Sequence, residues 1–366
     1  MSTFMPNIRC ADRKTVLKPR DRALLFCEQF GLRAPVLMGP MAGSSPVALA
    51  FAVAEAGGVG ACGAMLMDPK QISDWASAFR ACSNGAFQIN IWIPNEFVPF
   101  DVAAVEAMTL LLNKHDAILE PITTSGLPDF SEQCAAIVEV APPIVSSIMG
   151  LYPPNVVEAL HARRSRWFAN VTSVHNACAA QEAGADAVVV SGIEAGGHRG
   201  AFDPADAERH GGTLFALLPI VCDAVSIPVI AAGGIADGRA LAAALTLGAS
   251  AVQVGTALLR SPEAGTAAVW SNAIAQSLPE DTVLTRAFSG RLARAVRNGW
   301  IEEVGGKALP YPAQRQATLH LRTAALERED LAIMQMWAGQ AASKARAVPA
   351  GTIVRDLWEE AKLLLA

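Results

Sequence analysis

Short apolar runs alternate with alanine-rich stretches of helical periodicity from residue 34 to about residue 260. Each run is apolar on both faces and ends in Gly, Asn, Ser or Thr. Such runs are typical of parallel strands that are covered by helices on both sides. We therefore predict eight strands, at residues 35–39, 58–61, 87–91, 144–148, 167–171, 187–190, 228–232 and 251–254.

The stretches between these runs carry the periodicity of helices. Alternation of strand and helix indicates parallel β/α units, and eight units in about 230 residues favour an α/β fold of the (β/α)8 TIM barrel type. The alternative, a doubly wound open sheet, usually has fewer strands and a G-x-G-x-x-G motif that Gly39-Pro-Met-Ala-Gly43 does not match. The predicted helices are at residues 46–56, 69–81, 102–114, 130–140, 155–163, 174–183, 213–225 and 238–247.

The alternation stops after about residue 265. Residues 261–276 and 317–346 have helical patterns, and an irregular stretch separates them. We predict that residues 1–265 form the barrel and that residues 266–345 form a small C-terminal helical domain that caps the substrate site. Residues 346–366, with a helix at 353–365, are expected to complete the barrel.

Composition narrows the possible partners. The 366-residue chain is 52% hydrophobic, enough for a large core, and has a net charge of −5. Its basic residues are dispersed, so we expect no nucleic-acid partner, but a small molecule or a second copy of the chain. Seven cysteines without C-x-x-C spacing favour a reducing cytoplasm. No apolar run reaches about 18 residues, so we expect no membrane span.

Glycines follow the last two predicted strands, where barrels of this class commonly bind phosphate. Gly233 and Gly234 follow the seventh strand, and Gly255 with Thr256 follows the eighth. Glycines let the backbone approach a ligand closely, and the amides that open the next helices would point at an anion. A tight strand-to-helix turn is the alternative explanation for either pair alone.

Two amide side chains lie inside apolar runs, Asn90 in the third and Gln253 in the eighth. A buried amide without a hydrogen bond costs about 1–3 kcal/mol, so each requires a partner. Both lie toward the carboxyl ends of their strands, where they could bind a heterocyclic or ribityl group. Hydrogen bonding to a neighbouring backbone group is the alternative for each.

His198 follows the sixth strand on a loop with glycines at positions 196, 197 and 200. This loop lies on the catalytic face of a barrel, and an imidazole with an ordinary pKa of about 6.5 suits a general base near neutral pH. We find no metal motif, because no third ligand accompanies Glu194 and His198 at a suitable spacing.

Several motifs, in the same order along the chain, resemble the FMN-dependent nitronate monooxygenases, formerly called 2-nitropropane dioxygenases, and in particular their class I members. The resemblance spans residues 34 to 350 and rests on Gly39-Pro-Met-Ala-Gly43, Phe87-Gln-Ile-Asn90, Gly192-Ile-Glu-Ala-Gly-Gly-His-Arg-Gly200, Ile230-Ala-Ala-Gly-Gly-Ile235, Val252-Gln-Val-Gly-Thr256, Phe288-Ser-Gly-Arg291, Tyr311-Pro-Ala-Gln314 and Met336-Trp-Ala-Gly-Gln340.

The resemblance implies non-covalent FMN at the carboxyl ends of the strands, with His198 as the catalytic base. It implies oxidation of alkyl nitronates, and of nitroalkanes in some members, by O2 to a carbonyl compound and nitrite. Ser191 occupies a position that is often glutamine in the family. The residues expected at FMN are Pro40, Met41, Ala42, Asn90, Ser191, Gly196, Gly233, Gly234, Gln253, Val254, Gly255 and Thr256.

Two other enzymes on this barrel remain alternatives, an FMN-dependent enoyl-acyl-carrier-protein reductase and an NADH:quinone reductase. The segments that begin at Tyr311 and Met336 argue against the first. A non-catalytic flavin-binding protein is a further alternative, which the histidine in an otherwise complete loop makes less favourable.

Overall fold

The computed structural model describes residues 17–96, 98–119, 122 and 127–366. Eight parallel strands form one sheet, and each of the eight overlaps the run predicted for it. The prediction of a (β/α)8 TIM barrel is confirmed. The strands are β1 (Val36–Met38), β2 (Gly60–Gly63), β3 (Phe87–Trp92), β4 (Ile144–Ile148), β5 (Arg166–Val171), β6 (Ala187–Ser191), β8 (Val229–Ala232) and β9 (Ala251–Val254).

Strands β1 and β2 close the sheet into a barrel. The sheet order is β1-β9-β8-β6-β5-β4-β3-β2, so these two strands are its edges. Leu37 and Val59 form a parallel bridge between them, and the Met38 amide donates to the Val59 carbonyl at 2.9 Å. Closure leaves no free edge, which is the usual way in which a barrel avoids edge-to-edge association.

Alternating residues of each strand enter two different cores. On β6, Ala187 and Val189 pack in the barrel interior, whereas Val188 and Val190 pack under the surrounding helices. Because successive side chains point to opposite faces, both faces of such a strand are apolar. This explains why the sequence shows continuous apolar runs.

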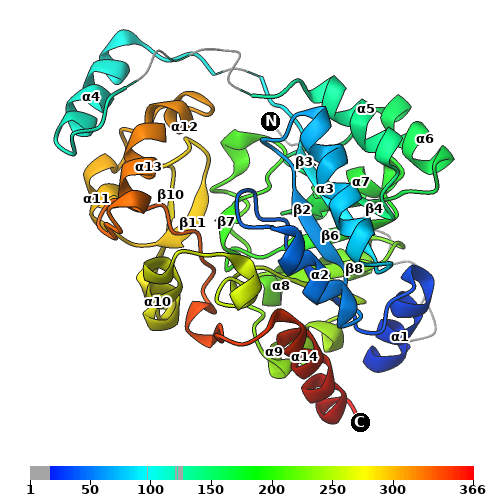
Figure 1. Cartoon of the computed structure of the whole chain (residues 1–366). Coiled ribbons are helices and arrows are strands. Elements are labelled where there is room, and N and C mark those ends of the chain that lie inside the picture. Colours follow the sequence, from blue (N-terminus) through cyan, green and yellow to red (C-terminus); the bar gives the residue numbers. More distant parts are fainter. Residues whose placement is uncertain (1–16, 97, 120–121, 123–126) are drawn as a thin grey trace, which may run out of the picture.

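Helices surround the barrel, and the last of them comes from the C-terminus (Figure 1). The predicted helix at 353–365 is present as α14, which packs against α2 and α9 and so fills the eighth helix position. Glu360 on α14 accepts a hydrogen bond from the Gly238 amide at 3.0 Å. The surrounding helices are α2 (Val47–Glu55), α3 (Pro69–Cys82), α5 (Phe130–Val140), α6 (Pro154–Ala162), α7 (Val174–Glu182), α8 (Leu214–Ala224), α9 (Gly238–Thr246) and α14 (Ala350–Leu364).

Helix α1 (Pro19–Phe30), which the sequence reading missed, covers the amino ends of the strands. Its rings at Phe26 and Phe30 lie against Phe168 of β5, with the Phe30 ring edge-on at 5.1 Å. The same apolar cluster includes Ile144 and Ala187, which begin β4 and β6. Helix α1 therefore closes the amino end of the barrel with apolar side chains.

A second core lies beside the barrel (Figure 1). Helix α4 packs there against α11, although its sequence position lies between two barrel strands. Buried Met108, Leu112 and Trp300 belong to this second core. The division of the chain into two domains stays a prediction. The helices of this part are α4 (Val102–Asn113), α10 (Ala268–Gln276), α11 (Gly299–Val304), α12 (Ala313–Ala317) and α13 (Leu319–Glu327).

The C-terminal region also contains a small antiparallel sheet that the sequence did not predict. Its order is β10 (Thr282–Thr285), β11 (Ala293–Val296) and β7 (Gly197–His198). The prediction of helix throughout 317–346 is wrong, since α13 ends at Glu327 and most of the following segment is irregular. No helix in the described part of the chain has both the length and the apolarity that a membrane crossing needs.

Candidate active site

A cavity of about 500 Å³ opens at the carboxyl ends of the barrel strands and is lined on its other side by the second core. Every site residue predicted from the sequence lines this one cavity. They are Pro40, Met41, Ala42, Asn90, Ser191, Gly196, His198, Gly233, Gly234, Gln253, Val254, Gly255 and Thr256. The volume lies within the range of roughly 300–1,000 Å³ that is common for ligand sites.

The two amide side chains in the strands each have one protein partner. Asn90 donates through Nδ2 to Ser146 Oγ at 3.1 Å, and Gln253 accepts from Gln88 Nε2 at 3.3 Å. Both partners are side chains and not the backbone groups of the alternative explanation, and both amides line the cavity, so their binding of a ligand stays a prediction.

Sequence reasoning missed three polar residues on the neighbouring strands. Ser146 and Ser147 on β4 and Asn170 on β5 line the same cavity. Asn170 donates to Ser191 Oγ at 3.4 Å, while its Oδ1 is buried without a partner in the described structure. Asn170 stands near the end of an apolar run, as Asn90 does, so the same signal would have found it.

The glycine loops offer backbone amides at the carboxyl end of the barrel. Gly233 and Gly234 adopt φ of 111° and 70°, values that side chains strongly disfavour. Among the described residues, the amides of Gly234 and Gly255 donate to no backbone carbonyl. The first turn of α9 is already capped, because Asp237 accepts from Ala240 N at 3.1 Å. The Ala240 amide is therefore not available to an anion, whereas the loop amides are, and phosphate binding here stays a prediction.

Gly196 brings the His198 loop against the second core. A Cβ at this position would lie 2.5 Å from the backbone nitrogen of Gly339 and 2.6 Å from the carbonyl carbon of Ala338. The Gly339 amide donates to Thr256 Oγ1 at 3.0 Å. Gly196 is thus required for backbone packing, and the Thr256 hydroxyl already has a protein partner.

His198 lies in a short strand and not on the free loop that its glycine neighbours suggest. Strand β7 pairs with β11, which places His198 opposite Ala293. The Nε2 atom of His198 lies 2.8 Å from Ser289 Oγ. The rings of Trp92 and Trp337 pack against the imidazole in T-shaped arrangements. Their centroids lie 4.7 and 5.0 Å from the centroid of the imidazole. The imidazole is held on three sides and lines the cavity.

Three guanidiniums surround this histidine, and the sequence reading assigned none of them to the site. Burial and, to a lesser degree, the positive charges of Arg291, Arg315 and Arg322 together lower the pKa of His198 to about 3. Arg315 and Arg322 line the cavity itself. A neutral imidazole beside several cations forms an environment that attracts an anion.

Glu194, considered above as a metal ligand, has a structural role. Its two carboxylate oxygens each accept from the Leu214 amide at 3.0 Å, at the start of α8. A carboxylate at this position satisfies a free amide and interacts favourably with the helix dipole.

Together, the fold and the site define a (β/α)8-barrel enzyme with its active site at the carboxyl ends of the strands. Residues 25–360 match the family model described as nitronate monooxygenase. A probable nitronate monooxygenase of Staphylococcus aureus (strain Newman) is 34% identical over 338 residues, which cover 90% of this chain and 95% of the relative. The chain belongs to the nitronate monooxygenase family, and it is a flavin-dependent oxidoreductase.

Solved structures agree with this assignment. Nitroalkane oxidase from Streptomyces ansochromogenes superposes with a TM-score of 0.85 and 33% identity, over 93% of this chain and all of that one. FabK from Thermotoga maritima has a TM-score of 0.74 and 28% identity, over 96% and 98% of the two chains. An enoyl reductase domain of MlnA from Bacillus amyloliquefaciens, at 14% identity and a TM-score of 0.62, shares the fold.

Proposed function

We propose that this protein is an FMN-dependent nitronate monooxygenase, which uses O2 to convert alkyl nitronates into a carbonyl compound and nitrite. The observation that carries the proposal is the neutral His198 among three guanidiniums, inside the cavity of a chain that belongs to this family. A nitronate is an anion, and a cavity with unneutralised positive charge favours it over neutral compounds.

The residues of the cavity fit FMN. Asn170 Oδ1 has no partner among the described residues, and the loop amides of Gly234 and Gly255 donate to no backbone carbonyl there, so these groups can bond the cofactor. Asn90 and Gln253 would bond the ring system or ribityl chain, and the loop amides would hold the phosphate. When bound, FMN supplies the redox chemistry, taking electrons from the substrate and passing them to O2.

The guanidiniums of Arg315 and Arg322 orient the substrate in this proposal. Arg322 donates to Thr318 Oγ1 and to the Arg315 carbonyl, both neutral acceptors, so its charge remains available. Buried Arg291 lies over the rings of Trp92 and Tyr311, at 5.9 and 5.0 Å, and adds to the same field. Positioning an anion beside these groups stabilises it without any proton transfer.

His198 accepts the substrate proton when the substrate is a neutral nitroalkane. Its Nε2 is engaged with Ser289, which leaves Nδ1 for the proton. A pKa of about 3 makes the imidazole a weak base, so we expect this step to be slow. A nitronate needs no deprotonation, and we therefore propose nitronates as the better substrates.

Two measurements test the proposed function. The cofactor is released from the purified yellow protein by denaturation and identified by chromatography, and nitrite is then measured after aerobic addition of ethyl nitronate. We expect FMN and catalytic nitrite release. A protein that binds FMN but yields no nitrite would support the non-catalytic alternative, and a protein that binds no flavin would contradict the proposal.

A further inference from the structure

The residue after His198 faces away from the cavity. Arg199 follows the short strand β7, where successive side chains point to opposite sides, and it does not line the cavity. Its side chain is 6% exposed. A buried guanidinium is costly unless its donors are satisfied, so its hydrogen-bond partners indicate its role.

The Arg199 guanidinium joins the two ends of the segment that carries His198. Its Nη1 atom donates to the carbonyl of Ser191, the last residue of β6, at 2.5 Å. Its Nε and Nη2 atoms both donate to the carbonyl of His210, the Nε at 3.0 Å. Nineteen positions separate these carbonyls in the chain, and α8 begins soon after the second. The side chain thus closes residues 191–210 into a loop with His198 inside it.

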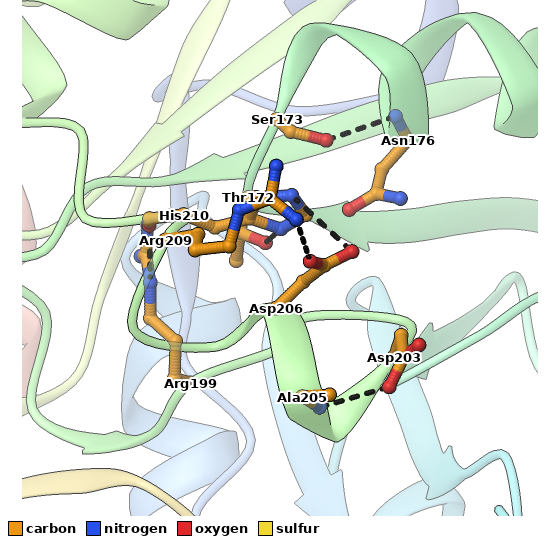
Figure 2. Close-up of polar contacts among 9 residues, drawn as sticks. All are labelled: Thr172, Ser173, Asn176, Arg199, Asp203, Ala205, Asp206, Arg209 and His210. Atoms are coloured by element: carbon orange, nitrogen blue, oxygen red, sulfur yellow. Dashed lines mark hydrogen bonds and ion pairs between the residues drawn. The ribbon is translucent and has the colours of Figure 1, made fainter. Parts of the chain in front are cut away.

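The His210 end of this loop is itself fixed to the barrel, as Figure 2 shows. Its ring Nδ1 lies 3.3 Å from Oγ1 of buried Thr172, which directly follows β5. Its backbone amide donates to the Asp206 carbonyl at 2.8 Å, and its Nε2 lies 4.0 Å from the Asp206 carboxylate. The loop is therefore attached to β6 at one end and to the β5 end at the other.

We propose that Arg199 is a positioning residue, which clamps residues 191–210 so that the His198 ring stands in the cavity against Ser289. The planar guanidinium donates in two directions at once, toward Ser191 and toward His210. A lysine ammonium on a flexible stem keeps the charge but does not hold both carbonyls in one plane. Burial lowers the pKa of Arg199 to about 10, which leaves the clamp charged at neutral pH.

The proposal rests on the proposed function only where activity is measured, so its test has two independent readouts. The variant is Arg199→Lys in the FMN-bound protein, and the matched control is Arg209→Lys. Arg209 lies in the same loop, but its side chain is 82% exposed and pairs only with Asp206 on the surface. The control is expected to behave as wild type in both readouts.

The first readout is amide hydrogen exchange, which needs no activity. Exchange in residues 192–200 is expected to be at least about tenfold faster in Arg199→Lys, while α14 exchanges at the wild-type rate. Wild-type exchange in residues 192–200 would overturn the proposal. If Arg199→Lys does not fold, Thr172→Val is used instead, because this change removes the hydroxyl that holds the His210 ring. Faster exchange in residues 192–200 then supports the proposal, and wild-type exchange overturns it.

The second readout compares two substrates. If Arg199 acts through His198, Arg199→Lys lowers kcat on nitroethane about tenfold more than kcat on ethyl nitronate, with FMN content unchanged. In a protein that already carries His198→Ala, Arg199→Lys then changes kcat by less than about twofold. Equal losses on both substrates, or undiminished losses in the His198→Ala background, would overturn it. A wild-type protein that releases no nitrite contradicts the proposed function instead, and hydrogen exchange still decides the clamp.

Discussion

At the scale of single residues, the surroundings of His198 set its charge. Burial and three guanidiniums lower the pKa of the imidazole to about 3, so it is neutral at pH 7. The same residues prepare the cavity for an anion, since the cations that repel a proton attract a nitronate. The same positive charges therefore explain both the lowered pKa of His198 and the preference for nitronates that we propose.

The depressed pKa of His198 predicts a pH dependence of stability. Below pH 6.5 the unfolded chain takes up a proton at His198 that the native state excludes until about pH 3, so the free energy of unfolding falls as the pH falls. Between pH 7 and pH 5 this amounts to about 2 kcal/mol. Urea unfolding of the wild type and His198→Asn at both pH values measures it. Between pH 7 and pH 5 the free energy of unfolding should fall by this much more in the wild type than in the variant. Equal decreases in the two proteins would contradict the lowered pKa of His198.

Replacing His198 also separates the two substrate classes. His198→Asn is expected to reduce kcat on neutral nitroethane by about 10²–10⁴-fold, because proton abstraction loses its base. On preformed ethyl nitronate the reduction is expected to stay below about tenfold, since no proton has to leave. Steady-state nitrite release with each substrate measures both values. Equal reductions would show that the histidine does not act as a base.

At the scale of elements, the contact between the His198 loop and residues 338–339 joins the barrel to the second core. Gly196 packs on the backbone there, and Gly339 N donates to Thr256 Oγ1. Arg294 of β11 reinforces it by donating to the Ile193 carbonyl at 2.9 Å. The cavity exists because these elements are held together from both sides.

A single methyl group at Gly196 should disrupt this contact. Gly196→Ala places a Cβ 2.5 Å from the Gly339 backbone nitrogen, and we expect it to lower the free energy of unfolding by at least about 2 kcal/mol. Gly212→Ala in the same region is the control, since its Cβ would meet only Leu217 Cβ at 3.7 Å. The control should change stability by no more than about 0.5 kcal/mol. Equal effects in urea unfolding would contradict the proposed packing.

The elements that the sequence predicted are those whose signal is local. A buried parallel strand such as β6 consists of consecutive apolar residues, and a barrel helix has its own period. The sheet β10-β11-β7 gave no such signal, because β7 has two residues and finds its partner nearly 100 positions away. Buried Arg294 further interrupts the apolar pattern of β11.

The candidate site divides in the same way. Asn90, Gln253 and the glycine loops are polar or flexible residues at strand ends, and the barrel topology alone brings them together. Arg315 and Arg322 enter the cavity from α12 and α13, so their place depends on how the second core docks. No local pattern encodes that docking, and the charges around His198 could not be predicted from the sequence.

At the scale of the whole molecule, the two ends of the chain complete the barrel. Helix α1 covers its amino end, and α14 fills the position between α9 and α2. Leu357 and Trp358 of α14 are buried in the main core. The barrel, whose strand ends line the cavity, thus depends on α14, which follows the second core in the sequence.

Truncating one buried side chain of α14 should therefore destabilise the whole barrel. Leu357 is 1% exposed, and Leu357→Ala is expected to cost about 2–5 kcal/mol through lost burial and a cavity. Leu363, on the same helix and 80% exposed, provides the control, for which Leu363→Ala should change stability by less than about 0.5 kcal/mol. Urea unfolding measures both. A small effect of Leu357→Ala would mean that α14 is not part of the barrel core.

The reaction itself provides the most direct test of the proposed function. The FMN-bound protein is mixed without oxygen, in separate experiments, with ethyl nitronate and with NADH, and the flavin absorbance is followed. The proposed function predicts rapid bleaching by the nitronate and none by NADH on the same timescale. Rapid bleaching by NADH, with the nitronate inert, would contradict the nitronate monooxygenase proposal and favour one of the NADH-dependent reductases on this barrel.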